Sequence, residues 1–268
     1  MKKVFKILKW TLKLTIGSLA LIIIAGLGVR IFGPTSHEPT GELVDIGGIN
    51  LHIHATGEKN NRPTLVIEGG RGTPTVYYHW LSEGLKDRMR VVRYDRAGLG
   101  YSDRSKAPRT PEFIAQELHQ LLENAGEKPP YILMGHSLGG NYVRVFTELY
   151  PDEVHALFLL DAAHPNRVQK IPSTPSRSSW KFKLVTIGEK LQAILGDLGV
   201  LALYDILTEP AFGRDMEGLP DEITDRTLDL LLDGKHFRTM ADETLGYHET
   251  LARAGEKTDF GTLPIRIV

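Results

Sequence analysis

The chain contains no cysteine, which excludes disulfide bonds, thiolate nucleophiles and cysteine-ligated zinc or iron–sulfur sites. It also lacks an excess of basic residues in its main part. Residues 1–33 carry six basic side chains and no acidic one, so the remaining 235 residues hold 26 basic and 33 acidic side chains. A surface with excess carboxylates repels a phosphate backbone, and the sequence therefore predicts no nucleic-acid partner. The 268 residues, 41% hydrophobic and 24% charged, are typical of one large or two small globular domains.

An uncharged stretch follows a cluster of five lysines at the N-terminus. Leu14–Val29 contains no charged residue, and with Lys13 extending toward lipid headgroups the apolar run covers Leu12–Phe32. That length is close to the roughly 20 residues that a helix needs to cross the hydrocarbon core of a bilayer. Because the lysines precede the run, the positive-inside rule predicts a cytoplasmic tail and a single transmembrane anchor over residues 1–33. The rest of the chain would then lie on the extracytoplasmic side.

A cleaved signal peptide is the alternative interpretation of the same residues. Its apolar core would be Leu14–Ala25 and its cleavage signal Gly26-Leu27-Gly28, which would release a secreted protein. We favour the anchor because the run stays apolar through Phe32. The lysine cluster also argues against a buried core helix.

The rest of the sequence predicts an α/β domain over residues 41–268, after a proline-containing polar linker at residues 34–40. Short apolar runs of strand length alternate with helical patterns, as in a mostly parallel central sheet flanked by helices. Gly47-Gly48 between the first two runs predicts a hairpin. The expected strands are Leu43–Ile46, Ile49–Ala55, Thr64–Glu68, Val91–Tyr94, Tyr131–Met134, Ala156–Asp161 and Leu263–Val268.

The carboxyl end of one expected strand carries a motif for nucleophilic catalysis. Tyr131–Met134 runs into Gly135-His136-Ser137-Leu138-Gly139-Gly140, and a helical pattern follows. Strand, G-x-S-x-G and helix form a nucleophile elbow, a tight turn that needs small residues two positions to either side of the serine. The turn exposes the Ser137 hydroxyl in the cleft and places it at a helix N-terminus, whose N–H groups favour a developing negative charge.

These residues resemble the α/β-hydrolase superfamily, and the resemblance extends from about residue 41 to residue 268. It implies an oxyanion hole formed by the backbone N–H groups of Leu138 and of Gly70, which lies in the loop Glu68–Gly72. Glu68 stands where the family usually carries histidine. Tyr94–Ser102 resembles the family's structural turn after the fourth strand, and a phosphate loop is not predicted there because no G-x-G-x-x-G is completed. No metal or organic cofactor is implied.

Helical patterns replace the strand rhythm at about residues 165–262, where this family inserts a helical cap over its active site. The expected helices are Lys183–Leu198, Asp221–Leu232 and His236–Ala254. We favour the interpretation that the apolar residues of this region pack the cap on the sheet. The alternative is that some of them line a pocket for an acyl or aromatic group. These residues are Ile194, Leu198, Leu201, Leu203, Ile206 and Leu207.

The acid and the histidine of a catalytic triad are not evident. The family places its acid after the strand that Leu263–Val268 resembles and its histidine after one strand more, so we interpret the end at Val268 as a C-terminal truncation. Asp161 occupies a position that some relatives use for the acid, although a turn-capping aspartate is favoured. His136 is expected to point away from the cleft. Weaker candidates for the base are His164, His236 and His248.

Taken together, the residues predict a membrane-anchored serine hydrolase with a small-molecule acyl substrate. Ser137 would attack the carbonyl and form an acyl-enzyme, which water would hydrolyse. Two alternatives remain: another reaction on the same scaffold, such as C–C bond hydrolysis or a perhydrolase activity, and a non-catalytic binding module that keeps the elbow without a base. Serine in the elbow argues against epoxide hydrolase or dehalogenase chemistry, which uses aspartate there.

Overall fold

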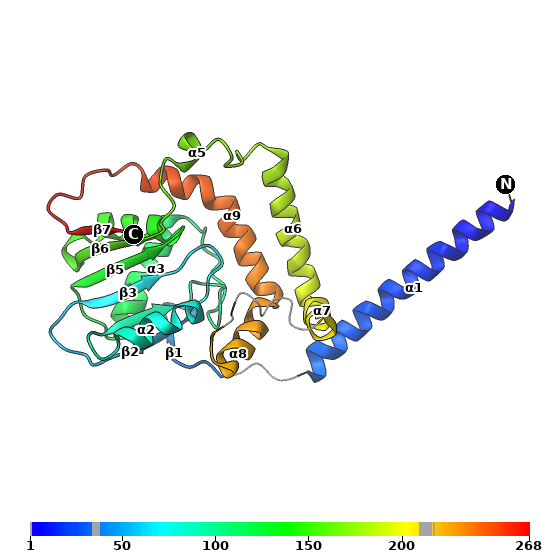
Figure 1. Ribbon diagram of the computed structural model, residues 1–268, viewed down its shortest axis with the longest axis horizontal. Coiled ribbons are helices and arrows are strands. Elements are labelled where there is room, and N and C mark those ends of the chain that lie inside the picture. Colours follow the sequence, from blue (N-terminus) through cyan, green and yellow to red (C-terminus); the bar gives the residue numbers. More distant parts are fainter. Residues whose placement is uncertain (1, 34–37, 209–215, 217) are drawn as a thin grey trace.

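A seven-stranded sheet lies at the centre of the computed structural model, counted over the residues that it describes, 2–33, 38–208, 216 and 218–268 (Figure 1). The strand order is β1-β2-β4-β3-β5-β6-β7. The β1–β2 and β2–β4 pairs are antiparallel and the other four pairs are parallel, which confirms the mostly parallel sheet. The strands are β1 (Glu42–Asp45), β2 (Asn50–Thr56), β3 (Thr64–Glu68), β4 (Val91–Tyr94), β5 (Tyr131–His136), β6 (Val154–Leu160) and β7 (Ile265–Ile267).

Two glycines close the predicted hairpin between β1 and β2. Gly47 and Gly48 have φ angles of 102° and 99°, in a region that is open to glycine because it has no Cβ. The register pairs Asp45 with Asn50 across this turn. The hairpin prediction is therefore confirmed.

Strands β3 and β4 are buried along their whole length because helices cover both faces of the sheet. Alternate residues of β3 point to opposite faces. Leu65 and Ile67 pack in a cluster with Leu85 of α2, whereas Val66 packs in the cluster that contains Leu118 of α3. The covering helices are α2 (His79–Leu85), α3 (Pro111–Asn124) and α4 (Gly139–Leu149), with the short 3-10 turns η1 (Thr75–Tyr78) and η2 (Pro151–Glu153).

A group of helices is inserted between β6 and β7. The longest, α9, packs against α4 and α6 and lies between α6 and the sheet (Figure 1). The three helices expected in this region are present, and α7 was not predicted as a separate helix. The inserted helices are α5 (Arg167–Lys170), α6 (Trp180–Asp197), α7 (Val200–Thr208), α8 (Asp221–Leu231) and α9 (Gly234–Ala254).

The apolar residues of the cap do not pack on the sheet, so that prediction was wrong. Ile194, Ile206 and Leu207 are exposed, whereas Leu201 is buried in a cluster with Phe237 and other cap residues. The physical reason is that α9 occupies the position next to the sheet and keeps α6 away from it. None of these residues lines a cavity found among the described residues either.

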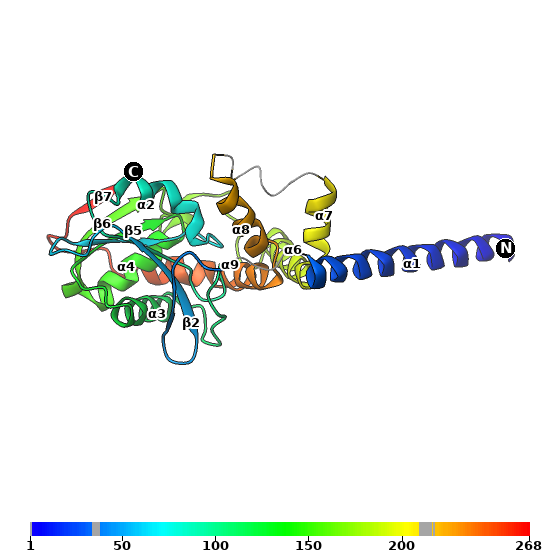
Figure 2. The same ribbon diagram turned by 90° about the horizontal axis from the view of Figure 1, so that it is seen from below.

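A single long helix, α1 (Lys2–Phe32), projects from the body of the protein (Figures 1 and 2). It is long and apolar enough to cross a bilayer, and nearly all of it is exposed. Only its C-terminal part contacts the cap: a Cβ on Gly26 would lie 2.6 Å from the Leu198 carbonyl oxygen, and Arg30 donates to the Gly196 carbonyl at 3.2 Å. Residues 34–37 of the predicted linker lie outside the described residues.

Two glycines of α6 provide a stability test with one substitution at two positions. We expect Gly188→Ala to raise the free energy of unfolding by about 0.5–1 kcal/mol, because the added methyl group would have no atom within 4 Å apart from its own stretch of helix, and alanine favours the helix. Gly196→Ala should lower it by roughly 1–3 kcal/mol, because its Cβ would lie 2.6 Å from the Gly234 nitrogen. Urea unfolding followed by circular dichroism measures both. Equal shifts in the two variants would contradict the packing of α6 on the α8–α9 turn.

Candidate active site

Ser137 occupies the turn between β5 and α4 in a backbone conformation that residues other than glycine rarely adopt. Its φ is 51°, in the left-handed region. Two glycines make the turn possible. A Cβ on Gly135 would lie 2.5 Å from the Gly140 Cα, and one on Gly139 would overlap the Glu68 carbonyl oxygen. The backbone thus has the strain and the close packing expected of a nucleophile elbow.

The loop after β3 lies against this turn. A Cβ on Gly70 would be 3.3 Å from the Ser137 Cβ, so Gly70 and Ser137 are direct neighbours. The Leu138 N–H has no hydrogen-bond acceptor among the described residues. The structure therefore brings together the three residues predicted for the site, Ser137, Gly70 and Leu138.

One of the two expected oxyanion donors is already engaged. The Gly70 N–H donates to the Tyr78 hydroxyl at 3.2 Å, and that hydroxyl lies 2.9 Å from the His136 Nδ1. Burial raises the pKa of Tyr78 to about 12, so the hydroxyl keeps its proton and can donate it to His136. The His136 ring lies beside Gly70, with its Nδ1 paired to the Tyr78 hydroxyl, and its orientation away from the cleft stays a prediction.

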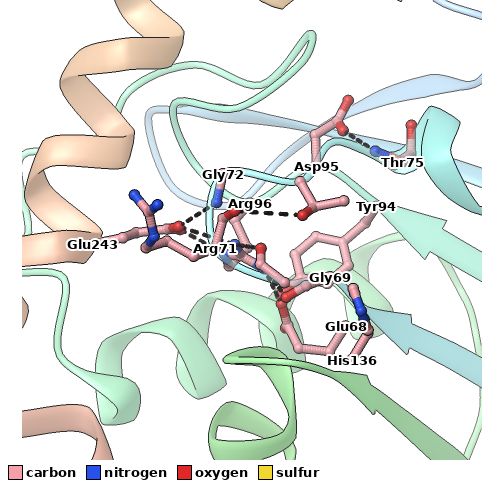
Figure 3. A network of polar contacts seen from close by, with 12 residues as sticks. Glu68, Gly69, Arg71, Gly72, Thr75, Tyr94, Asp95, Arg96, His136 and Glu243 are labelled. Atoms are coloured by element: carbon pink, nitrogen blue, oxygen red, sulfur yellow. Dashed lines mark hydrogen bonds and ion pairs between the residues drawn. The ribbon is translucent and has the colours of Figure 1, made fainter. Parts of the chain in front are cut away.

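A buried ion pair holds the same loop from the other side (Figure 3). Glu68 accepts a hydrogen bond from the Tyr94 hydroxyl and pairs with the Arg96 guanidinium at 2.5 Å. Arg96 also donates to the Gly69 carbonyl at 2.7 Å and to the Gly70 carbonyl at 2.6 Å. Glu68 thus acts with Arg96 to fix the loop backbone.

Arg96 has a second carboxylate partner, which comes from the cap. Its Nε lies 2.8 Å from Glu243 of α9, and Glu243 also accepts from the Gly72 N–H at 2.8 Å. Burial opposes ionisation of Glu243, but the charge and hydrogen bonds of Arg96 outweigh it and lower its pKa. For Glu68, burial outweighs the attraction of Arg96 and raises the pKa. One cation therefore links the β3 loop, the β4 turn and the cap.

The turn after β4 carries another buried pair. His52 Nδ1 lies 2.7 Å from Asp95, which also accepts from the Thr75 N–H at 2.7 Å. Gly98 and Gly100 have φ angles of 87° and 47°, which supports a structural interpretation of this turn. Within the described chain, no group of three or more histidine, aspartate or glutamate side chains could hold a metal ion.

No candidate base is hydrogen-bonded to the Ser137 hydroxyl in the part of the chain that the structure describes. His164 accepts from the Asn166 N–H at 3.0 Å, and His248 lies 3.0 Å from the Pro175 carbonyl oxygen. His236 is buried in α9, and burial lowers its pKa to about 4. Asp161 is exposed at the end of β6 with a φ of 40°. The structure does not bring these residues together into a triad.

Sequence patterns did not identify the roles of Tyr78, Arg96 and Glu243. Arg96 could have been singled out because a charged residue within an apolar turn region needs a partner when buried. Glu243 lies 147 positions further along the chain, and nothing in its helical pattern marks it as the partner. Tyr78 has no local signal either.

The sequence model of the alpha/beta hydrolase fold matches residues 63–192. The chain has the α/β-hydrolase fold, which this part of its sequence also matches. Cfl2 from Burkholderia cenocepacia is an α/β-hydrolase neighbour by structure, with a TM-score of 0.63 and 22% identity, over 84% of this chain and 77% of that one.

Two curated proteins are similar to the chain over part of their length. The uncharacterized protein YqjL of Bacillus subtilis is 35% identical over 168 residues, which cover 58% of this chain and 66% of the relative. The human (lyso)-N-acylphosphatidylethanolamine lipase is 35% identical over 107 residues, 39% of this chain and 31% of the lipase. The chain thus spans less than two thirds of the length of these relatives.

The paired charges at Arg96 lead to a prediction about stability. Arg96→Leu should lower the free energy of unfolding by about 3–5 kcal/mol, because it leaves two buried carboxyl groups without their cation. Arg104→Leu is the matched control. Its pair with Asp242 is about 40% exposed on both sides, and losing it should cost at most about 1 kcal/mol. Urea unfolding measures both, and similar losses in the two variants would show that the buried pair is not a main support of the fold.

Proposed function

We propose that the protein is a serine hydrolase that cleaves a carboxylic ester or a related acyl bond, with Ser137 as the nucleophile. The observation that carries this proposal is the strained turn that places Ser137 directly beside Gly70. Strain of this kind persists only where the surrounding structure enforces it, and it is concentrated at functional sites. The human relative is named as a lipase, which supports lipids with an acyl bond as one class of substrate for this protein.

The reaction would proceed through a covalent intermediate. The Ser137 oxygen attacks the carbonyl carbon, and the electron pair of the C=O bond moves to the carbonyl oxygen. The N–H groups of Leu138 and Gly70 hold this oxyanion, for which Gly70 exchanges the Tyr78 hydroxyl for the substrate oxygen. The intermediate then collapses, the bond between the carbonyl carbon and the alcohol oxygen breaks, and the alcohol leaves with the proton that the Ser137 hydroxyl gave up. Water then hydrolyses the acyl-serine, which releases the acid and restores the hydroxyl.

A general base must lie within about 2.6–3.2 Å of the serine oxygen, or somewhat farther in an unliganded site. No histidine makes such a bond to Ser137 in the described part of the chain, so we assign no residue to this role. The same observation favours the second candidate function, a binding module that retains the elbow without catalysis. Reaction with a fluorophosphonate separates the two, because only a serine with a working base reacts rapidly.

We expect Ser137→Ala to abolish both fluorophosphonate labelling and hydrolysis of a p-nitrophenyl ester. The loss in rate should be roughly a thousandfold or more, because the nucleophile itself is removed. Alanine fits the turn, so the melting temperature should stay at or above that of the parent protein. Ser178→Ala, at an exposed serine of the cap, is the control and should keep full activity. Hydrolysis by the Ser137→Ala protein would rule out Ser137 as the nucleophile.

We also propose that α1 anchors the protein in a membrane as a single-pass helix, with the hydrolase domain on the extracytoplasmic side. The five lysines before the apolar run support this orientation. A secreted protein after signal cleavage is the alternative.

The proposed anchor can be tested by membrane fractionation. The protein should remain in the membrane pellet after a carbonate wash, and its intact mass should include residues 1–28. A soluble product that begins near Val29 would instead support the signal peptide. A reporter fused before residue 1 should be protected in intact cells if the N-terminus is cytoplasmic.

A further inference from the structure

We propose that the outer surface of α6 and α7 lies on the lipid bilayer beside the α1 helix, so that the cap is docked on the membrane and not only tethered to it. This surface, called the cap face below, is apolar and exposed. Its members are Trp180, Leu184, Ile187, Leu191 and Ile194 of α6 and Ile206 and Leu207 of α7.

The helix α6 carries an apolar stripe on its exposed side. An amphipathic helix of a water-soluble protein turns its apolar stripe to the core. The buried side of α6 mixes apolar residues such as Phe182 with polar ones such as Thr186 and Glu189. Ile187 and Leu191 on the other side are 61% and 54% exposed. The exposed residues recur at three- and four-residue spacing and form one stripe. Such a stripe is stable when another apolar phase covers it.

The position of α1 indicates that this phase is the bilayer. The close approach of Gly26 to the Leu198–Val200 backbone holds α1 against the turn between α6 and α7. Both views show α6 and α7 on the side of the molecule from which α1 projects, with the sheet on the far side (Figures 1 and 2). A membrane that contains α1 therefore begins next to the cap face, and the two apolar surfaces are continuous.

The shape and charge of the cap face also suit a bilayer surface. α6 and α7 together are as apolar as a membrane span, but they are bent by 85° at the turn between them, which favours lying on a membrane over crossing it. The exposed charged residues of α6 are Lys181, Lys183 and Lys190. Lysines beside an apolar stripe are typical of helices that lie in the interface and attract anionic headgroups.

Docking would also determine where substrate enters. A cavity of about 310 Å³ lies between α6 and α9, lined by Phe182, Val185 and Tyr247, and it includes Arg71, the residue after Gly70. Val185 is half exposed on α6, one residue after Leu184 of the cap face. This extension rests on the proposed function: the substrates would be acyl amphiphiles drawn from the bilayer, with the apolar chain entering along α6.

The absence of cysteine allows a direct test on the full chain. Single cysteines at Ile187, Ile194 and Leu207 are labelled with the environment-sensitive dye NBD. The Ser137→Ala protein serves as background, so that no catalysis is involved. It is reconstituted into vesicles of phosphatidylcholine and phosphatidylglycerol with or without spin-labelled lipid. Ile24→Cys in α1 is the positive control, and Ile265→Cys, on the exposed strand at the far edge of the sheet, is the negative control.

We expect blue-shifted NBD emission and loss of intensity with spin-labelled lipid at the three cap positions and at Ile24, but not at Ile265. Quenching at Ile24 alone would overturn the proposal and leave the cap in water. Energy transfer between two labelled copies at Ile194 without lipid quenching would also overturn it, because a second copy would then cover the cap face.

A charged variant tests the consequence for substrate. In the Ser137→Ala background, the double variant Ile187→Glu with Leu191→Glu should abolish lipid quenching of the dye at Ile194→Cys. In the protein that keeps Ser137, the same double variant should slow hydrolysis of a long-chain ester carried in vesicles. Hydrolysis of a water-soluble short-chain ester should be unchanged, and Ile265→Glu should affect neither. Equal loss on both esters would contradict entry from the bilayer. Absence of all hydrolysis in the parent protein would refute the proposed function but would leave the quenching test of docking valid.

Discussion

The pairing of one buried arginine with two buried carboxyl groups fixes the parts of the candidate site relative to one another. Arg96 contacts Glu68 at the end of β3, Glu243 in the cap and two carbonyls of the glycine loop. Removing charges from water is costly, so such a group is stable only when every partner is in place. The direction of the Gly70 N–H, and hence the space beside Ser137, depends on this pairing. The cap is part of it, because Glu243 belongs to α9.

Local patterns predicted the centre of the fold well. The apolar runs Thr64–Glu68 and Val91–Tyr94 are strands buried on both faces. A strand covered on both sides is a nearly continuous apolar run, which is easy to recognise in the sequence. The turn at Ser137 was visible because its constraints are local: two glycines and a serine within five residues. The contacts around it were not visible, since Arg96 and Glu243 meet only after the whole chain has folded and their spacing in sequence carries no information.

The cap shows a different limit of sequence reasoning. Periodicity identified three helices of the cap, including the one that became α6 (Trp180–Asp197), and the residues from Ile194 to Leu207 indicated an apolar face in this region. The pattern does not say what lies against that face. We expected the sheet, because in a water-soluble domain the core is the usual apolar environment. The position next to the sheet is taken by α9, whose buried residues include Phe237 and Leu251, and the apolar side of α6 is left facing outward.

The hydrogen bond from Gly70 to the Tyr78 hydroxyl means that this N–H already has an oxygen acceptor, which a substrate oxygen would have to replace. A neutral carbonyl that replaces this hydroxyl exchanges one ordinary hydrogen bond for another, so it gains little on binding. A negatively charged oxygen gains more, because a hydrogen bond to an ion is roughly twice as strong. In the proposed reaction, the Tyr78 hydroxyl would therefore compete with the substrate carbonyl for the Gly70 N–H. The Gly70 hydrogen bond would then add little to substrate binding and would mainly stabilise the tetrahedral intermediate.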